Sequence, residues 1–297
     1  MCGIVGLFLK DKKLEPELGK LLADMLATMG ERGPDSAGFA IYGSEKPGVA
    51  KITLQCPDRS QFDGVAEALG KAVKAKVDVT FNGTHAVFRM EGVNEKEARK
   101  FLRERYPQLR IMGMGERIEI YKEVGYPTEV AKQFALRNMS GTHAIGHTRM
   151  ATESAVTTMG AHPFSTGSDQ CLVHNGSLSN HNNLRRELRR EGMVFETEND
   201  TEVAAAYLTS QMDKGLGLGE ALEQSLNDLD GFYTFVVGTR DGFGVVRDPV
   251  ACKPAVLAET DSYVAFGTEY RALAGLPGIE KAKVWEPEPA TVYFWER

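Results

Sequence analysis

The second residue of the chain is a cysteine, and an unbroken apolar segment follows it directly. This segment, Gly3–Leu9, has the continuous hydrophobic pattern that is typical of a strand buried on both faces. It has no basic region before it and no small-residue cleavage site after it, so the pattern of a secretion signal is missing. We therefore expect a core strand here, which would fix Cys2 at the mouth of a rigid core.

Cys2 also has the chemistry of a candidate nucleophile. Initiator methionine is ordinarily removed when the next side chain is small, which would leave a thiol and a free α-amine on one residue. An α-amine titrates near pH ~7.7–8.0, so it can exchange protons close to neutral pH. A nucleophile activated by the N-terminal amine is an established catalytic arrangement. A cysteine at this position carries little meaning alone, and the rest of the sequence has to support it.

The composition is that of a globular protein, with 42% hydrophobic and 26% charged residues among 297. The net charge of −6 argues against nucleic acid or an anionic membrane as the main partner. No run approaches the ~20 apolar residues of a membrane helix. The cysteines are scattered, with no zinc-type spacing, which predicts free thiols, no metal site and a cytoplasmic location. Apart from Cys2, they are expected to be buried and inert: Cys56, Cys171 and Cys252.

Periodicity predicts helices and strands in the first third of the chain. Leucine and methionine at i, i+3 and i+4 positions predict a helix over 15–29, with Pro16 in its first turn and Gly30 just after its end. A strand is expected over 38–42. Residues 48–123 are more charged, and their pattern predicts a strand, a helix, two strands, a helix and two further strands. This order indicates a small α+β insert of ferredoxin-like type.

Strands dominate from residue 142 onward. The turn signal Arg240-Asp-Gly242 separates two of them, which predicts a hairpin. Helices are expected at about 180–191, 200–213 and 219–229. Many strands with a few grouped helices, and no regular strand–helix–strand alternation, favour an α+β fold of antiparallel sheets flanked by helices.

Five short segments stand out, and in their order they resemble the class II glutamine amidotransferases. The catalytic domain of that family is an N-terminal-nucleophile hydrolase. The resemblance covers Cys2 to about residue 42 and residue 142 to the end. It implies a four-layer α/β/β/α sandwich over residues 2–297, with the insert 48–123 inside it. The segments are Met1-Cys-Gly-Ile-Val-Gly6, Arg32-Gly-Pro-Asp-Ser36, Gly146-His-Thr-Arg-Met-Ala-Thr152, His174-Asn-Gly-Ser-Leu-Ser-Asn180 and Asn199-Asp-Thr-Glu202.

The resemblance assigns roles to five residues. Cys2 would attack the side-chain carbonyl of glutamine, form a γ-glutamyl thioester and release ammonia. The Asn175 side chain and the Gly176 N–H would form the oxyanion hole, where a donor is typically worth about 3–4 kcal/mol. Arg149 would bind the substrate α-carboxylate and Asp200 its ammonium group. Without the resemblance, Asn-Gly reads as a turn, Arg149 as a surface arginine and Asp200 as a helix N-cap.

Two further positions match the family. Arg32 is expected either to organise the Cys2 end of the pocket or to form a structural salt bridge. His162 is expected to give structural support. The chain departs from the common family pattern at Met150, where tryptophan is frequent, and at Gly160, where asparagine is frequent.

A longer match around residues 146–158, together with the insert, looks most like one subgroup. These are the separate amidotransferase subunits of glutamate-synthase-like complexes, including the A subunit of N-methylglutamate synthase. The amidotransferase region extends to Arg297, so we expect the acceptor chemistry on another polypeptide. The resemblance implies partner subunits that carry FMN and an iron–sulfur cluster, with no cofactor in this chain. The insert is our candidate docking element.

Three functions remain open at this point. The chain is either a glutaminase subunit that supplies ammonia through a tunnel, or a catalytically weak glutamine- or glutamate-binding assembly subunit of such a complex. A stand-alone γ-glutamyl amide hydrolase is the third. The joint presence of Cys2, Arg149, Asn175, Gly176 and Asp200 favours the glutaminase.

Overall fold

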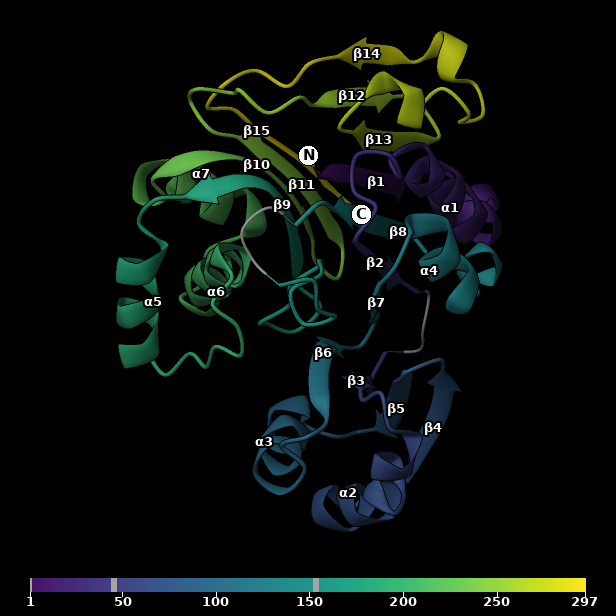
Figure 1. The fold of residues 1–297 in the computed structure, drawn as a ribbon, viewed down its shortest axis with the longest axis vertical. Helices are drawn as coiled ribbons and strands as arrows, with labels where there is room; N and C mark the ends of the chain where they lie inside the picture. The colour runs from purple at the N-terminus through teal and green to yellow at the C-terminus, as the bar shows by residue number, and fades with distance from the viewer. Residues whose placement is uncertain (1, 44–46, 152–154) are drawn as a thin grey trace.

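The computed structural model describes residues 2–43, 47–151 and 155–297. The main body of the protein is built from two antiparallel sheets (Figure 1). The larger sheet has the strand order β14-β12-β13-β1-β8-β2-β7, and the smaller has β15-β11-β10-β9. The strands of the larger sheet are β1 (Gly3–Leu9), β2 (Ser36–Tyr42), β7 (Ile118–Val124), β8 (His143–Arg149), β12 (Val256–Glu259), β13 (Tyr263–Gly267) and β14 (Lys283–Trp285). Those of the smaller sheet are β9 (Cys171–Leu178), β10 (Gly231–Gly238), β11 (Gly242–Arg247) and β15 (Val292–Glu296).

Helices cover the outer face of each sheet. One hydrophobic cluster joins α1 and α4 to the larger sheet, a second joins α5, α6 and α7 to the smaller sheet, and a third lies between the sheets. The expected four-layer α/β/β/α sandwich is thus confirmed. The helices are α1 (Leu18–Thr28), α4 (Pro127–Gln133), α5 (His181–Arg190), α6 (Asp200–Asp213) and α7 (Leu218–Asp228), with 3-10 helices at Lys12–Glu17, Arg59–Phe62, Leu136–Asn138, Tyr270–Ala272 and Ile279–Lys281. Within the described ranges, no helix is both long and apolar enough to cross a bilayer.

Strand β1 is buried along its whole length, as its apolar sequence predicts. Val5 and Leu7 pack toward α1, whereas Ile4 and Phe8 point into the layer between the sheets. Strands β13 and β8 flank β1 on either side. Each large apolar side chain buried in this way contributes about 1.5–3 kcal/mol. This burial fixes the position of the residue that precedes the strand.

A third sheet forms the insert, which lies as a separate lobe at the bottom of Figure 1. Its strand order, β4-β5-β3-β6, with one helix after the first strand and one after the third, is the ferredoxin-like arrangement expected from the sequence. A hydrophobic cluster of its own, which includes Ile52, Leu69, Phe88 and Leu102, holds it together. Its elements are β3 (Val49–Gln55), α2 (Val65–Val73), β4 (Val77–Asn82), β5 (His85–Glu91), α3 (Glu95–Arg105) and β6 (Arg110–Gly115).

The boundary predicted at residue 123 is wrong, because β7 belongs to the larger sheet. Strand β7 pairs with β2 from Ile118 opposite Tyr42 to Val124 opposite Ser36. Ile118 and Ile120 pack in the layer between the sheets, which accounts for this placement. The strands of the insert therefore end at Gly115.

Other local predictions have mixed outcomes. The hairpin at 240–242 is confirmed by the pairing of β10 with β11. Cys56 and Cys171 are buried as expected, but Cys252 is exposed because it follows β11 in an irregular segment. The first predicted helix begins as a 3-10 helix, and its α-helical part starts only at Leu18.

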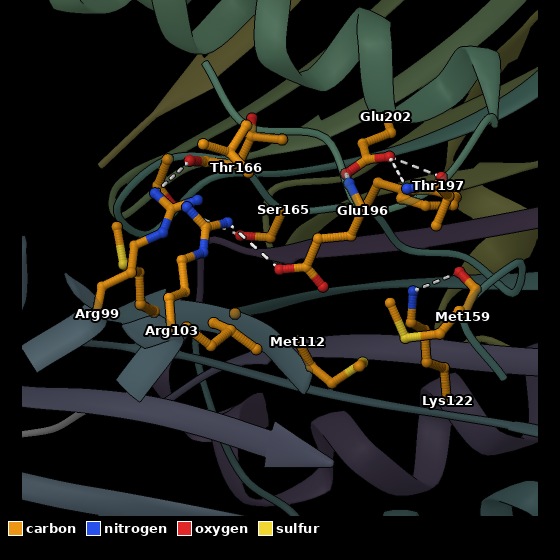
Figure 2. Close-up of a pocket in the computed structure, with 16 residues that line it drawn as sticks. Arg99, Arg103, Met112, Lys122, Met159, Ser165, Thr166, Glu196, Thr197 and Glu202 are labelled. Carbon is orange, nitrogen blue, oxygen red and sulfur yellow. Dashed lines mark hydrogen bonds and ion pairs between the residues drawn. The ribbon is translucent and has the colours of Figure 1, made fainter. Parts of the chain in front are cut away.

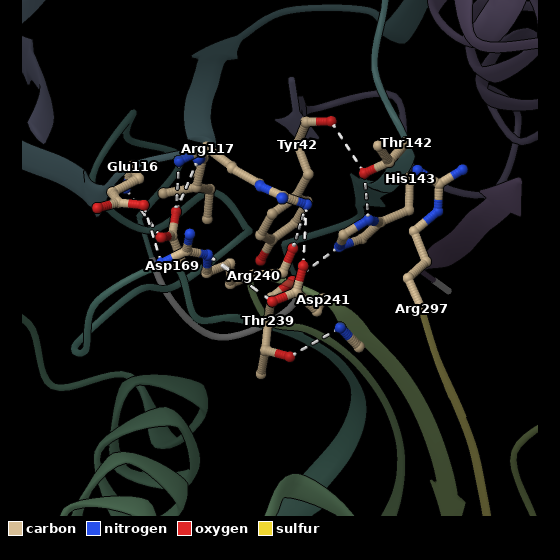
Figure 3. A network of polar contacts seen from close by, with 12 residues as sticks. Tyr42, Glu116, Arg117, Thr142, His143, Asp169, Thr239, Arg240, Asp241 and Arg297 are labelled. Carbon is tan, nitrogen blue, oxygen red and sulfur yellow. Dashed lines mark hydrogen bonds and ion pairs between the residues drawn. The ribbon is translucent and has the colours of Figure 1, made fainter. Parts of the chain in front are cut away.

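One carboxylate ties the insert to the core (Figure 3). Asp169 accepts hydrogen bonds from the backbone N–H groups of Glu116 and Arg117, both at 2.8 Å, and of Ile118 at 2.9 Å. A Cβ atom at Gly115, where φ is +155°, would collide with this carboxylate. Ion pairs from Arg117 to Asp241 and from Arg240 to Glu116 surround it. Residues of the core therefore fix the position of the turn between β6 and β7.

We predict that Asp169→Ala lowers the free energy of unfolding by about 3 kcal/mol or more, because three buried or half-buried N–H groups lose a charged acceptor. Urea denaturation measures this loss. The exposed Asp261 offers the matched control, and Asp261→Ala should change stability by less than about 0.5 kcal/mol. Equal losses in the two variants would contradict the anchoring role of Asp169.

Candidate active site

Cys2 lies at the open end of β1, next to the end of β8, since Gly3 pairs with Thr148. Its side chain is partly exposed, and its thiol lies 3.8 Å from the carbonyl oxygen of Met150. Two side chains donate hydrogen bonds to the backbone carbonyl oxygen of Cys2: Arg32 Nε at 3.1 Å and Asn175 Nδ2 at 3.3 Å. Segments distant in sequence thus meet at this cysteine.

Asn175 and Gly176 lie inside strand β9, so the alternative interpretation of this pair as a turn is wrong. They pair with Thr234 and Tyr233 of β10. Gly176 has a φ of +143°, and a Cβ atom there would collide with the carbonyl oxygen of Phe232. Only glycine fits this close approach of two backbones. Gly176 is exposed while Asn175 is buried, so the glycine presents bare backbone beside the carboxamide.

Arg149 is the last residue of β8 and is only 7% exposed. Its Nη1 donates to the carbonyl oxygen of Ala155 at 3.4 Å, and a Cβ atom at Gly160 would come within 3.3 Å of the same nitrogen. Ala155 and Gly160 therefore lie against the guanidinium, so the departure from the family pattern at Gly160 is next to Arg149. Met150 is exposed. Thr152, which closes the predicted motif, lies outside the described residues, as does Met1.

Asp200 opens helix α6 but does not cap it. The cap is Asn199, whose side chain accepts from the N–H of Thr201 at 2.8 Å. The Asp200 carboxylate instead accepts from the backbone N–H of Leu178 in β9 at 3.0 Å. This bond places Asp200 at the strand that carries Asn175 and Gly176. Its side chain is half-buried, so one side of the carboxylate faces solvent.

Two buried histidines meet at the Thr201 hydroxyl, and a third histidine stacks on one of them. Thr201 Oγ1 lies 2.8 Å from His162 Nε2 and 3.1 Å from His174 Nδ1. His147 stacks on His162 with ring centroids 4.1 Å apart, and its Nε2 lies 3.2 Å from the carbonyl oxygen of His174. The supporting role expected of His162 agrees with this position. Thr201 stands in a recognised motif, yet nothing in the sequence showed that its hydroxyl bridges two rings.

Burial keeps these imidazoles neutral. It lowers the pKa of His147 to about 3 and that of His162 well below its usual value, where the neighbouring His147 adds to the effect. Burial also lowers the pKa of His174, although the nearby Asp200 carboxylate opposes the change. Among the described residues, no group of three or more His, Cys, Asp or Glu side chains is arranged to hold a metal ion.

The segment after β13 supplies two residues that sequence reasoning missed. Thr268 Oγ1 accepts from the Ile4 N–H at 2.8 Å and from Asn175 Nδ2 at 3.3 Å, so it joins β1 to the carboxamide. Glu269 forms an ion pair with Arg32. Arg32 therefore does both things expected of it, since it also binds the Cys2 carbonyl. Both residues directly follow β13, and no sequence motif pointed to them.

The five predicted site residues thus gather at one end of β1, β8 and β9. A thiol, a carboxamide and a bare glycine backbone lie together, with a cation at the end of β8 and a half-buried carboxylate bonded to β9. In such a site the thiol can attack a carbonyl carbon, and the cation and the carboxylate can bind the two opposite charges of a zwitterionic head group.

Comparisons with known proteins agree with this geometry. Residues 147–275 match the family described as "Glutamine amidotransferase domain". The chain is 65% identical over its whole length to the glutamine amidotransferase-like protein GlxB of Rhizobium meliloti, of which it covers 98%. It is 33% identical to a putative glutamine amidotransferase of Methanothermobacter thermautotrophicus, covering 99% of both chains.

A solved structure shows the same fold. Glutamine phosphoribosylpyrophosphate amidotransferase from B. subtilis superposes with a TM-score of 0.64 at 20% identity. The match covers 99% of this chain but only 47% of that one, so the chain spans about half of its length.

We predict that stability falls as the pH drops from 7 to 5. Unfolded histidines protonate near pH ~6.5, whereas the folded pKa values of His85, His143 and His147 are lowered to about 3 by burial. The unfolded state therefore binds more protons between these values, and each such histidine removes up to about 1.4 kcal/mol per pH unit.

Urea titrations at a series of pH values measure this slope. Carboxylates protonate at lower pH, so the range between 7 and 5 reports mainly on the histidines. His143→Gln should reduce the slope by the share of one histidine, whatever its effect on absolute stability. A flat stability profile between pH 7 and 5 would contradict the prediction.

Proposed function

Because this chain is an enzyme of the class II glutamine amidotransferase family, we propose that it hydrolyses the side-chain amide of glutamine at Cys2. The observation that carries the proposal is the hydrogen bond from Asn175 Nδ2 to the Cys2 carbonyl oxygen. It brings the candidate oxyanion donor to the candidate nucleophile from 173 residues away.

The reaction follows from the chemistry of these groups. Once Met1 is removed, the Cys2 amine takes the thiol proton, and the sulfur attacks the δ-carbonyl carbon. The Asn175 amide and the Gly176 N–H stabilise the oxyanion, each donor contributing about 3–4 kcal/mol. Collapse of this intermediate breaks the C–N bond, and the amine returns a proton to the departing ammonia. Water then attacks the thioester, which releases glutamate and restores the thiol.

Opposite charges would hold the amino-acid head of glutamine. Arg149 can bind the α-carboxylate with two parallel N–H donors, and its low exposure strengthens the interaction. Asp200 can accept from the α-ammonium group, since one oxygen is already fixed by the Leu178 N–H. The other oxygen, Oδ1, accepts from the Thr201 hydroxyl at 3.5 Å, so both carboxylate oxygens are oriented by the protein.

The histidines and Thr201 would act by positioning Asp200 and Asn175. His174 precedes Asn175 in β9, and Thr201 follows Asp200 in α6, so the Thr201–His174 contact joins the two site segments. Neutral rings suit this task because they add no charge beside the substrate ammonium group.

We further propose that the chain works as the amidotransferase subunit of a glutamate-synthase-like complex, such as N-methylglutamate synthase. FMN and an iron–sulfur cluster would then be bound by the partner subunits. The match around residues 146–158 and the presence of the ferredoxin-like insert support this assignment. The insert has its own core and extends away from the site end of the sheets, which suits a docking element (Figure 1).

The direct test is glutamate release from glutamine by the purified chain, with and without its co-purified partners. We expect Cys2→Ala to abolish release, and Cys252→Ala, which alters an exposed free thiol, to leave it unchanged. Intact mass establishes beforehand that Met1 has been removed. Absence of Cys2-dependent release under both conditions would overturn the glutaminase proposal and favour a binding subunit. Full release without partners would favour a stand-alone hydrolase.

We predict that Thr201→Val raises the KM for glutamine about tenfold, with a smaller effect on kcat, because Asp200 Oδ1 loses the Thr201 hydroxyl that donates to it at 3.5 Å and that also contacts His162 and His174. Thr209→Val is the matched control, since Thr209 is a buried threonine on the same helix that bonds Thr166 instead. Both variants should lose some stability. A similar rise in KM for both would show that Thr201 has only a structural role.

A further inference from the structure

A cleft separates helix α3 of the insert from the core, and its lining residues come from both lobes. Its outer part has a volume of about 380 Å³. Its inner part, shown in Figure 2, has a volume of about 30 Å³, enough for one or two water molecules. Arg99, Arg103, Met114 and Thr166 line both parts, so we treat them as one site and call it the α3 cleft.

None of the residues assigned to glutamine chemistry lines this cleft. Cys2, Arg149, Asn175, Gly176 and Asp200 are absent from both of its parts. The volume of the outer part is within the range that holds a small organic molecule. The cleft is therefore a separate candidate site.

The insert wall of the cleft is basic. Lys96, Arg99, Lys100 and Arg103 follow i, i+3, i+4 and i+7 spacing, which places them along one face of α3, and all four line the cleft. Four cations on one short helix face are unexpected in a chain whose net charge is −6.

Most nearby carboxylates already have partners. Glu104 lies 4.0 Å from Lys100, and Glu196 lies 3.4 Å from Arg103. Glu202 accepts from the N–H groups of Glu196 and Thr197 and from the Thr197 hydroxyl, each within 2.8 Å. The charges of Glu196 and Glu95 act on Arg99 to a smaller extent than burial does, and among the described residues neither acid forms an ion pair with it. Asp213 lies on the opposite wall, contributed by α6.

Arg99 is poorly satisfied for a guanidinium with five N–H donors. Its recorded hydrogen bond is from Nη1 to the carbonyl oxygen of Thr166 at 3.0 Å, and its buried Nε has no partner among the described residues. Arg247 and Arg185 also leave Nε unpaired, but each donates to three other acceptors. Arg103 resembles Arg99, since its buried Nε is also unpaired and its Nη2 donates to Glu196 at 3.4 Å, so both arginines of the cleft are poorly satisfied.

The electrostatics agree with this geometry. Burial, together with the adjacent charge of Arg103, lowers the pKa of Arg99 to about 10, although Glu196 and Glu95 oppose the change. The charged form is thus less favourable than in water, while Arg99 stays protonated at neutral pH. An anion in the cleft would reverse this penalty, because an opposite charge favours the protonated form.

We propose that the α3 cleft binds a small metabolite through a carboxylate or phosphate group, with Arg99 as the principal ligand and Arg103 beside it. Both oxyanions offer acceptor pairs that match the planar donors of a guanidinium. The Arg99 side chain points across the cleft toward residues 165–166 of the core, so a bound oxyanion would contact both lobes (Figure 2). Lys96 and Lys100 line the outer part, where they would attract an anion from solvent.

Calorimetric titration of the full chain with succinate and, separately, with inorganic phosphate tests the proposal. We expect saturable binding of at least one of them, and the tighter one identifies the preferred oxyanion. Arg99→Gln should weaken that binding about tenfold to a hundredfold, since hydrogen bonds to charged groups are lost. Arg103→Gln provides a second variant with a smaller expected loss.

The matched control is Arg105→Gln, because Arg105 lies on the same helix, is exposed and does not line the cleft. It should leave binding unchanged. Cys2→Ala should also bind normally, which separates this site from the glutamine site. Binding of neither anion at millimolar concentration, or equal weakening by Arg99→Gln and Arg105→Gln, would overturn the proposal.

Discussion

The burial of β1 on both faces is the constraint on which the candidate site depends. Residues of this strand pack alternately toward α1 and into the layer between the sheets, while β13 and β8 hold its edges. A shift of one residue would reverse both sets of side chains, so the register is strongly specified. Cys2 precedes Gly3 in this strand and therefore has a defined position beside the end of β8. The proposed nucleophile is thereby held by the rigid core although it lies near the start of the chain.

The insert interrupts the main chain without disturbing this core. It leaves the larger sheet after β2 and returns to it in β7, and these two strands are direct neighbours. The two connections therefore lie close together at the sheet edge, where Asp169 clamps the returning turn. This arrangement explains how a lobe with its own hydrophobic core can be accommodated by the sandwich.

Local patterns predicted most of the elements, because hydrophobic period and turn residues act over short distances. The helix at α1, the 240–242 hairpin and the order of elements in the insert are examples. Which strands pair with one another was harder to predict. The sequence of β7 fits either sheet, and only the packing of Ile118 and Ile120 between the layers decides. Asn175-Gly176 reads as a turn locally, yet its place in β9 follows from pairing with β10. The five site residues were identified from the family resemblance. The roles of Thr201, Thr268 and Arg99 follow from contacts between distant segments, which no local sequence pattern encodes.

The first turn of α6 links the candidate active site to the α3 cleft. Asp200 and Glu202 are both acidic residues at a helix N-terminus, where the helix dipole favours negative charge. Asp200 accepts from the backbone of β9 on the side of the candidate active site, whereas Glu202 accepts from residues 196 and 197, which line the α3 cleft. One carboxylate of this turn therefore binds β9, and the other binds the wall of the cleft. Because both carboxylates bind backbone N–H groups, the distance between the two sites is set by main chain rather than by mobile side chains.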